Sequence, residues 1–577
     1  MRRLSVSWII AGLMVCTPLE SSGAPGVVSG PLVVSESWPE CTSLQTWMRD
    51  VMRLEHVETA SDTAQAKVFF RWLRLFSKMA TGGMIQAHEG PCGREQYVLD
   101  AHKNLFVYGW GYCDTHSRIA EAAWSEFKKD RSTAERVVVQ HPEGGYHTMY
   151  RLKLDGHYAA FDARYGYYLI DRDAPEARVL DWAEVGINEN ILRNKTFKHR
   201  SQPFFEYFGK EWERALAVEP RYFETEEDWV KAGSPSECVF GNGQYVMGTP
   251  LHDMNFQLPK GTTIERFWDN SARKFYVPDG FESKGEEPFQ PSGRFYRVTE
   301  TMFDGNWVRF DPNYQLAKAY VSTVPANESY KAEVSGGKTI GQAWGKMTYE
   351  PDWRSSNFLK VSAVETNLSH QTSAPFLLPA IVTGGGWAMF DFYCPYVLVD
   401  GELAGEWVGS RDDGLRVEMR TLESKRSRRL QPDVWTPWQT LASAAGIFRV
   451  PLGRDKGSAR TKVSLHGIYR FQVRFSIKPS AARKEEVGLK GLKLEAYFEN
   501  GIMSIPRIVS GSNVIHFKVV DGTQVRDPIE VIYNYQNQSG ETRHQQRIHP
   551  RDFQSNMATY SLEAPGLIRC NSLSIRY

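Results

Sequence analysis

The sequence has few cysteines and no excess of either charge, and each shortage argues against a class of protein. Seven cysteines occur in 577 residues, with no CxxC spacing, so neither a zinc ribbon nor a dense disulfide scaffold is expected. Lys and Arg number 69 and Asp and Glu number 68, which gives a formal net charge of +1. No global field would draw this chain to nucleic acid or to an anionic membrane.

Long apolar runs are also missing after the first residues. Arg2 and Arg3 precede a mostly apolar run over residues 4–19, and a stretch of small residues follows at 21–24. This order is typical of a signal peptide, so we expect residues 1–24 to be removed and the mature protein to be secreted or periplasmic. No later stretch reaches 18 apolar residues, and we do not expect the protein to span a membrane.

The cysteines that follow the signal peptide are widely scattered. Six remain once Cys16 has left, and an exported protein can form one or two disulfide bonds from such a set. Cys41 and Cys92 are the pair nearest in sequence. If Cys113 is kept as a thiol, five others remain and at least one of them has no partner.

Aromatic residues are abundant, at 13% of the chain. This content, with 47 glycines, is typical of β-rich proteins, because flat rings pack well on pleated surfaces. The length suggests roughly three or four domains. We assign residues 25–200 to a catalytic domain, 201–365 to a β-rich middle region and 366–577 to β-sandwich accessory domains.

Helical and strand periods alternate in the first of these regions. Apolar residues recur at helical spacing over 43–57, 62–80 and 116–129. The period then changes, and the next segments read as strands at 136–140, 147–154 and 157–163. Gly144-Gly145 and Asp155-Gly156 mark the turns between them. Helices followed by antiparallel strands predict an α+β fold for this region.

The C-terminal half alternates in the manner of a β-sandwich, and it contains no nucleophile–base or carboxylate pair set into its strands. Trp435 and Trp438 lie three residues apart beside Pro437, in an edge or loop context. They either pack the rim of the sandwich or form a stacking platform for sugar rings. Four basic residues between 425 and 429 would assist if the glycan is anionic.

One segment has an internal echo. Residues 154–167 (LDGHYAAFDARYGY) recur approximately as 303–316 (FDGNWVRFDPNYQL). The second copy has Tyr296 where the first has His147, so it cannot repeat chemistry that needs the histidine. We interpret the echo as a favoured Asp-Gly hairpin used twice.

Three residues of the α+β region combine into a catalytic pattern. Cys113 falls where a Gly-containing loop runs into the helix at 116–129, and backbone N–H groups at a helix start favour the thiolate. His147 begins one strand and Asp162 lies on the next, beyond the Asp155-Gly156 turn. A hairpin can place an imidazole beside a carboxylate, which fixes the tautomer of the imidazole and stabilises its charged form.

These motifs resemble the transglutaminase-like superfamily, whose papain-like core has Cys, His and Asp in this order. The matching residues are Gly111-Tyr112-Cys113, His147, Asp155-Gly156, Tyr158 and Asp162, within residues 60–175. The resemblance implies a transglutaminase-like catalytic domain with a Cys113–His147–Asp162 triad.

Two positions depart from the family pattern. Tyr158 stands where a Trp is usual, and Asp114 follows the cysteine, where its charge would disfavour both the thiolate and anionic substrates. No cluster of acids with calcium-site spacing appears, so we expect no metal and no cofactor. His116, His141 and His157 lie near Cys113 in sequence, but their spacing fits no zinc pattern.

The implied activity is amide hydrolysis or acyl transfer through a Cys113 thioester, with a peptide or protein amide as substrate. The backbone N–H of Cys113 would supply one oxyanion donor, and Trp110 and Tyr112 are near-site candidates for the second. Two other classes stay open: a polysaccharide-active lyase or hydrolase that uses His and Tyr, and a non-catalytic surface-binding protein with a degenerate core. Replacing Cys113 by Ala discriminates among the three.

Overall fold

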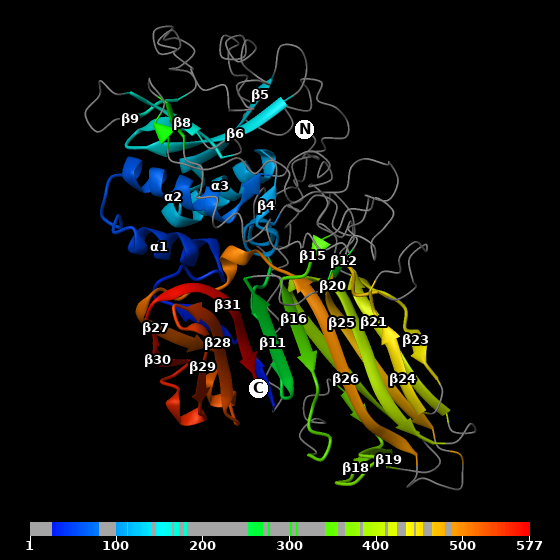
Figure 1. Ribbon diagram of the computed structural model, residues 1–577. Coiled ribbons are helices and arrows are strands. Elements are labelled where there is room, and N and C mark those ends of the chain that lie inside the picture. Colours follow the sequence, from blue (N-terminus) through cyan, green and yellow to red (C-terminus); the bar gives the residue numbers. More distant parts are fainter. Residues whose placement is uncertain are drawn as a thin grey trace, which may run out of the picture.

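The computed structural model of this chain is β-rich, with few helices and a large antiparallel sheet, consistent with a β-sandwich (Figure 1). It describes residues 26–79, 100–111, 113–140, 146–163, 167–171, 178–181, 252–268, 275–276, 301–302, 307–309, 341–355, 364–380, 385–409, 414–423, 434–443, 446–453, 464–478, 480 and 487–577. The expected signal peptide lies outside these residues. Within them, no helix is long and apolar enough to cross a membrane.

Three helices form where the apolar period predicts them: α1 (Leu44–Leu54), α2 (Asp62–Phe76) and α3 (Cys113–Lys128). The Ser43 hydroxyl accepts the N–H of Thr46 at 3.0 Å and so caps α1, and Ser61 caps α2 in the same way. The predicted apolar side of α3 is buried, and Trp124 is fully enclosed.

An antiparallel sheet covers these helices, as the change of period predicts. Its strands are β5 (Ala134–Gln140), β6 (Tyr146–Leu154), β7 (His157–Asp162), β8 (Tyr167–Asp171), β9 (Arg178–Val179), β13 (Thr301–Met302) and β14 (Trp307–Arg309), with the path β13-β14-β8-β7-β6-β5. Asp155 and Gly156 have φ of 50° and 90°, as a tight hairpin turn requires. Phe69 and Phe70 of α2 contact Tyr150 and Phe161 of the sheet, and these rings form the core of the layer.

The echoed hairpin extends this same sheet. Trp307 of β14 pairs with Leu169 of β8, and β8 in turn pairs with β7, so one strand separates the two copies. The remainder of the echo, including Asp311, lies outside the described residues.

A long strand, β20 (Gly386–Val408), organises the second part of the molecule. Its first half pairs with β25 (Ile468–Lys478), and its second half pairs with β24 (Gly446–Pro451) and β26 (Gly488–Glu499). The register shifts between Tyr393 and Leu398, where the strand passes from one layer to the other. Tyr349 contacts Phe390 and Phe392 across the layers.

Further strands complete these layers. They are β16 (Gly345–Tyr349), β17 (Val364–Thr366), β18 (Leu368–His370), β19 (Leu377–Pro379), β21 (Gly414–Glu423), β22 (Val434–Trp435) and β23 (Gln439–Ala442). Met419, Val473 and Phe475 alternate with polar neighbours and are buried, which confirms the alternation predicted for β21 and β25.

The same large sheet continues beyond β16 through β11 (Thr262–Phe267), β31 (Leu567–Arg576), β28 (Ile529–Asn537) and β29 (Gly540–Ile548). A separate three-stranded sheet contains β2 (Leu32–Ser35), β27 (Gly511–Lys518) and β30 (Met557–Ala564). Val33 pairs with Phe517, so the first described residues of the chain lie among its last strands. Further short pairs are β1 (Val27–Ser29) with β10 (Gln257–Pro259), and β12 (Phe275–Tyr276) with β15 (Gly341–Gln342).

Candidate active site

Cys113 is the first residue of α3, and a short glycine-containing turn leads to it. The π-helical turn η2 (Lys103–Tyr108) ends at Gly109, whose φ of 68° carries no steric penalty for glycine. β4 (Trp110–Gly111) then pairs in parallel with β3 (Lys78–Met79). The Cys113 side chain is partly exposed, and its sulfur is in no disulfide bond. The backbone therefore presents this thiol at a helix start.

The charge of Asp114 is compensated by two buried arginines. Arg118 donates from Nε to one carboxylate oxygen at 2.8 Å, and Arg136 donates from Nη1 to the other at 2.7 Å. The arginine side chains are 5% and 7% exposed, so solvent screens these pairs little. The expected penalty on the Cys113 thiolate is therefore reduced. The contact also ties the start of α3 to β5.

The β6–β7 register sets the positions of His147 and Asp162. The pairs run from Leu154 and His157 to Tyr150 and Phe161. Continued by one residue, this register puts position 149 opposite Asp162, and His147 two residues further along β6. In a regular hairpin these are diagonal positions on one face, about 7–8 Å apart and within reach of long or aromatic side chains. We therefore expect the two residues to be neighbours, although not directly opposite one another. A regular register would put them on the face of the hairpin opposite to Tyr150 and Phe161, which pack on α2, so convergence with Cys113 requires a local irregularity such as a β-bulge.

The side chain of His147 lies outside the described residues, so its contacts with Cys113 and Asp162 stay a prediction. Its backbone pairs with Val139 of β5, the strand that carries Arg136. Tyr112 lies outside the described residues too. Trp110 is placed only by its backbone in β4, and the oxyanion roles of both residues stay predictions.

Asp162 is fully buried at the end of β7. The guanidinium of Arg74, on α2, donates to the carbonyl oxygen of the next residue, Ala163, at 2.5 Å. Burial raises the pKa of the Tyr150 hydroxyl well above its usual value, the Asp162 carboxylate raises it further, and Arg74 opposes the shift. The side chains of Asp162, Tyr150 and Arg74 therefore interact electrostatically. Tyr150 and Arg74 were missed from sequence, because neither belongs to a local motif.

Tyr158, at the position where the family has Trp, joins three strands. Its hydroxyl donates to Glu135 of β5 at 2.6 Å, and the Arg151 guanidinium lies 4.0 Å from its ring centroid. The bond to Glu135 raises the pKa of Tyr158 to about 12. Tyr158 thus has a structural role, because its contacts hold β7 against β5 and β6.

Three other described cysteines differ from Cys113. Burial raises the pKa of the Cys41, Cys394 and Cys570 thiols, and Cys394 is fully enclosed. Cys41 is in no disulfide bond, and its thiol donates to the carbonyl oxygen of Pro39. Cys92 and Cys238 lie outside the described residues. In the described part of the chain, no three His, Cys, Asp or Glu side chains are grouped to hold a metal.

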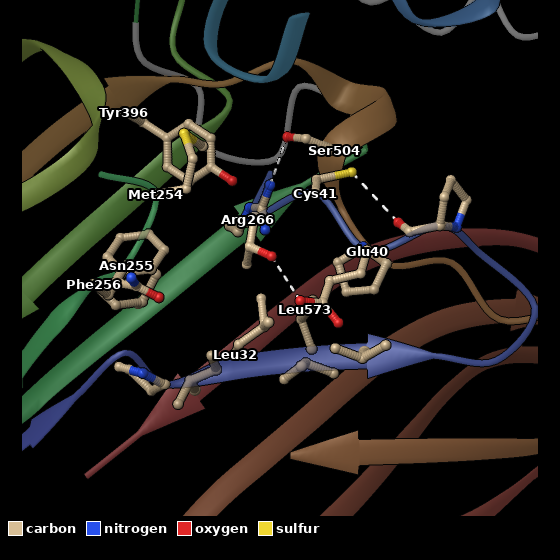
Figure 2. A pocket seen from close by; sticks show the side chains of 18 residues that line it. Leu32, Glu40, Cys41, Met254, Asn255, Phe256, Arg266, Tyr396, Ser504 and Leu573 are labelled. Carbon is tan, nitrogen blue, oxygen red and sulfur yellow. Dashed lines mark hydrogen bonds between the residues drawn. The ribbon is translucent and has the colours of Figure 1, made fainter. Parts of the chain in front are cut away.

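Cys41 also borders a cavity of about 30 Å³ between β2, β11, β20 and β31 (Figure 2). The Arg266 guanidinium donates to Ser504 at 2.8 Å and lies 4.6 Å from the centroid of the Tyr396 ring. The space suits one or two water molecules. No histidine is among the described residues that line it, so none of them offers Cys41 the base that a nucleophile needs.

The comparisons identify no family. No family model matches the chain, and no curated protein matches it. Among solved structures, a putative β-galactosidase from Bacteroides fragilis is 13% identical over 32% of this chain and 28% of its own, with a TM-score of 0.11. A β-glucuronidase from Bacteroides uniformis is 11% identical, with coverages of 32% and 22% and the same TM-score. The chain thus spans less than a third of either protein.

A third solved structure is matched over a larger share of its own length. A putative secreted protein from Parabacteroides distasonis is 8% identical over 40% of this chain and 80% of its own, with a TM-score of 0.15. TM-scores this low carry no argument about fold or function.

Proposed function

We propose that this protein is a secreted cysteine acyl-transfer enzyme with a transglutaminase-like catalytic domain. The observation that supports it most is the placement of Cys113 at the start of α3, beside a β6–β7 hairpin that carries Asp162 at its end and His147 near its start. In the proposal these three residues supply the thiol nucleophile, the base and the orienting carboxylate.

In the proposed reaction, the Cys113 thiolate attacks an amide carbonyl, and the oxyanion forms near the helix start. The C–N bond breaks as the charged imidazole of His147 protonates the leaving amine, and a thioester remains on Cys113. His147 then takes a proton from water or from an acceptor amine. The resulting nucleophile releases the acyl group and restores the thiol.

The contacts of Asp114 support this assignment indirectly. A carboxylate next to a nucleophilic thiol opposes thiolate formation, and Arg118 and Arg136 compensate that charge. The pair also couples α3 to β5, which pairs with the strand of His147. A shift of the helix against the sheet would therefore break the buried Arg136–Asp114 ion pair.

The test uses the mature protein with a casein mixture and a fluorescent primary amine. Amine incorporation into casein indicates transfer, and release of ammonia without amine incorporation, or of new amino termini, indicates hydrolysis. Cys113→Ser should abolish both, whereas Cys570→Ser, on β31, should retain them. Turnover that survives in Cys113→Ser would favour a polysaccharide-active enzyme. The same sample would then be assayed for depolymerisation of uronic-acid polymers.

A further inference from the structure

A ladder of arginines and tryptophans lies on the face of β21 and β25 that points away from the sandwich core. We call it the Trp–Arg ladder, and its members are Arg420, Trp435, Trp438, Arg470 and Arg474. The residues between them on the two strands, such as Met419 and Val473, point into the core. The strands and register thus separate an apolar face from a charged one.

The arginine side chains alternate with the indole rings. The Arg420 guanidinium lies 4.7 Å from the ring centroid of Trp435 and 4.6 Å from that of Trp438. Arg474 is 4.3 Å from Trp438, and Arg470 is 5.8 Å from Trp435. These distances are within the range of cation–π attraction. The indoles therefore hold three guanidiniums in fixed positions.

The carboxylates of this face lie deeper than the arginines. Arg474 is 30% exposed while its partner Glu418 is 8% exposed. Arg470 is 37% exposed while its bidentate partner Asp391 is 19% exposed. Positive charge is therefore nearer to solvent than the negative charge that balances it.

Arg420 is held differently from the other two. Its Nε donates to the neutral amide oxygen of Gln472 at 2.7 Å. The structure gives it no carboxylate partner among the described residues. Burial lowers the pKa of Arg420, the neighbouring positive charge of Arg474 lowers it further, and the charge of Asp391 opposes this shift only in part. A bound anion would relieve that repulsion.

We propose that the Trp–Arg ladder binds an acidic polysaccharide, through its carboxylate or sulfate groups and the guanidiniums of Arg420, Arg470 and Arg474. Planar guanidiniums match such oxyanions in geometry. The indoles act by positioning the arginines, since their ring faces are already in contact with guanidiniums. Sugar rings that carry the charges would contact the exposed indole edges. This site is separate from the proposed acyl transfer.

A polysaccharide suits the site better than nucleic acid does. Among the described residues, the arginines of the ladder lie on only two strands, and the whole chain has a formal net charge of only +1. Nucleic-acid binding depends on neutralising many phosphates, which needs a wider basic surface.

The test is affinity electrophoresis of the full-length protein in gels that contain dextran sulfate, polygalacturonate or uncharged dextran. We expect retardation by one or both acidic polymers and none by dextran, and the two acidic gels separate sulfate from carboxylate recognition. Arg420→Gln should weaken binding about tenfold, the effect of losing one charge-assisted bond. Arg449→Gln, on β24, is the matched control, since Arg449 is 75% exposed and outside the ladder.

Trp438→Phe should bind nearly as well as the parent protein, and Trp438→Ala should bind less well, because the ring holds two arginines. Equal retardation of Arg420→Gln and the parent protein would overturn the proposal. So would equally tight binding to duplex DNA at matched salt, which would indicate a non-selective cationic patch. Cys113→Ser should bind like the parent protein, which keeps this outcome independent of the proposed catalysis.

Discussion

The N-terminal sheet and the sheet of the Trp–Arg ladder both place arginines beside carboxylates. The arginine of the first sheet lies on a buried face, and those of the second lie on a face that is open to solvent. Arg136 of β5 reaches Asp114 on the neighbouring helix and is 7% exposed. Arg470 and Arg474 of β25 reach carboxylates of their own sheet and remain about a third exposed. A buried pair fixes the position of elements because an unpaired charge is costly there, whereas an exposed arginine can still bind a ligand. The face of the sheet decides which of these an arginine does.

The largest expected effect on turnover distinguishes the aspartates of the two copies of the internal echo. Asp162→Asn should reduce turnover by about 10⁴, the loss measured for the equivalent change in a serine triad, with little change in substrate binding. An amide cannot stabilise the charged imidazole and favours the wrong tautomer. Steady-state kcat and KM measure the two effects, and the melting temperature shows whether the fold persists.

Asp311→Asn is the matched control, since it occupies the equivalent position in the second copy of the echo. Its activity should equal that of the parent protein. Equal losses in both variants would mean that the aspartate of this hairpin is structural in each copy.

A second experiment compares one arginine from each sheet. Arg136→Gln should destabilise the N-terminal region by about 3 kcal/mol, because Asp114 stays buried with only Arg118 as partner. Arg420→Gln should cost about 1 kcal/mol, since it removes cation–π contacts and one hydrogen bond at the surface. Amide hydrogen exchange in α3 and in β21 localises the two losses.

The double variant Asp114→Asn/Arg136→Gln tests the cause of the larger loss. With both charges gone, most of the stability should return, and Cys113 should alkylate faster than in Arg136→Gln alone. If the double variant is no more stable than Arg136→Gln, the arginine stabilises the fold by packing rather than through its charge.

The smallest expected effect compares a thiol from each region. Cys113 should alkylate at pH 7 about tenfold faster than Cys570 or more, because a helix start favours the thiolate. Burial raises the pKa of Cys570, so its thiolate is scarce at neutral pH and its alkylation should rise only at alkaline pH. Labelling with iodoacetamide from pH 6 to 10, followed by peptide mapping, measures both rates. Preferential labelling of Cys570 at pH 7 would refute the assignment of Cys113.

Local patterns predicted much of the N-terminal fold. The three helices and the β5–β7 strands formed within a few residues of their predicted bounds, because apolar periodicity and the Ser and Asp-Gly signals are local. The pairing of β2 with β27 could not be predicted in this way, since about 480 residues separate the two strands. Nor could the addition of β14 to the edge of β8.

Some residues of the candidate site could likewise be predicted from local sequence, and others could not. Cys113, His147 and Asp162 could be named from motif and spacing, and the helix start at Cys113 follows from the sequence. Arg74, Tyr150 and Arg136 could not be named. Their place depends on how α2 and β5 pack around the hairpin, and residues of these types are common throughout the chain.

The sequence by itself determined the short-range features: where helices and strands form, which faces are apolar, and which thiol stands at a helix start. Each of these depends on residues within one or two turns of one another. Only the tertiary structure decided where the charges lie. It buried Arg136 against Asp114 and left Arg420 between two indoles at the surface. The physical reason is that the effect of a charge depends on its surroundings, and long-range packing creates those surroundings.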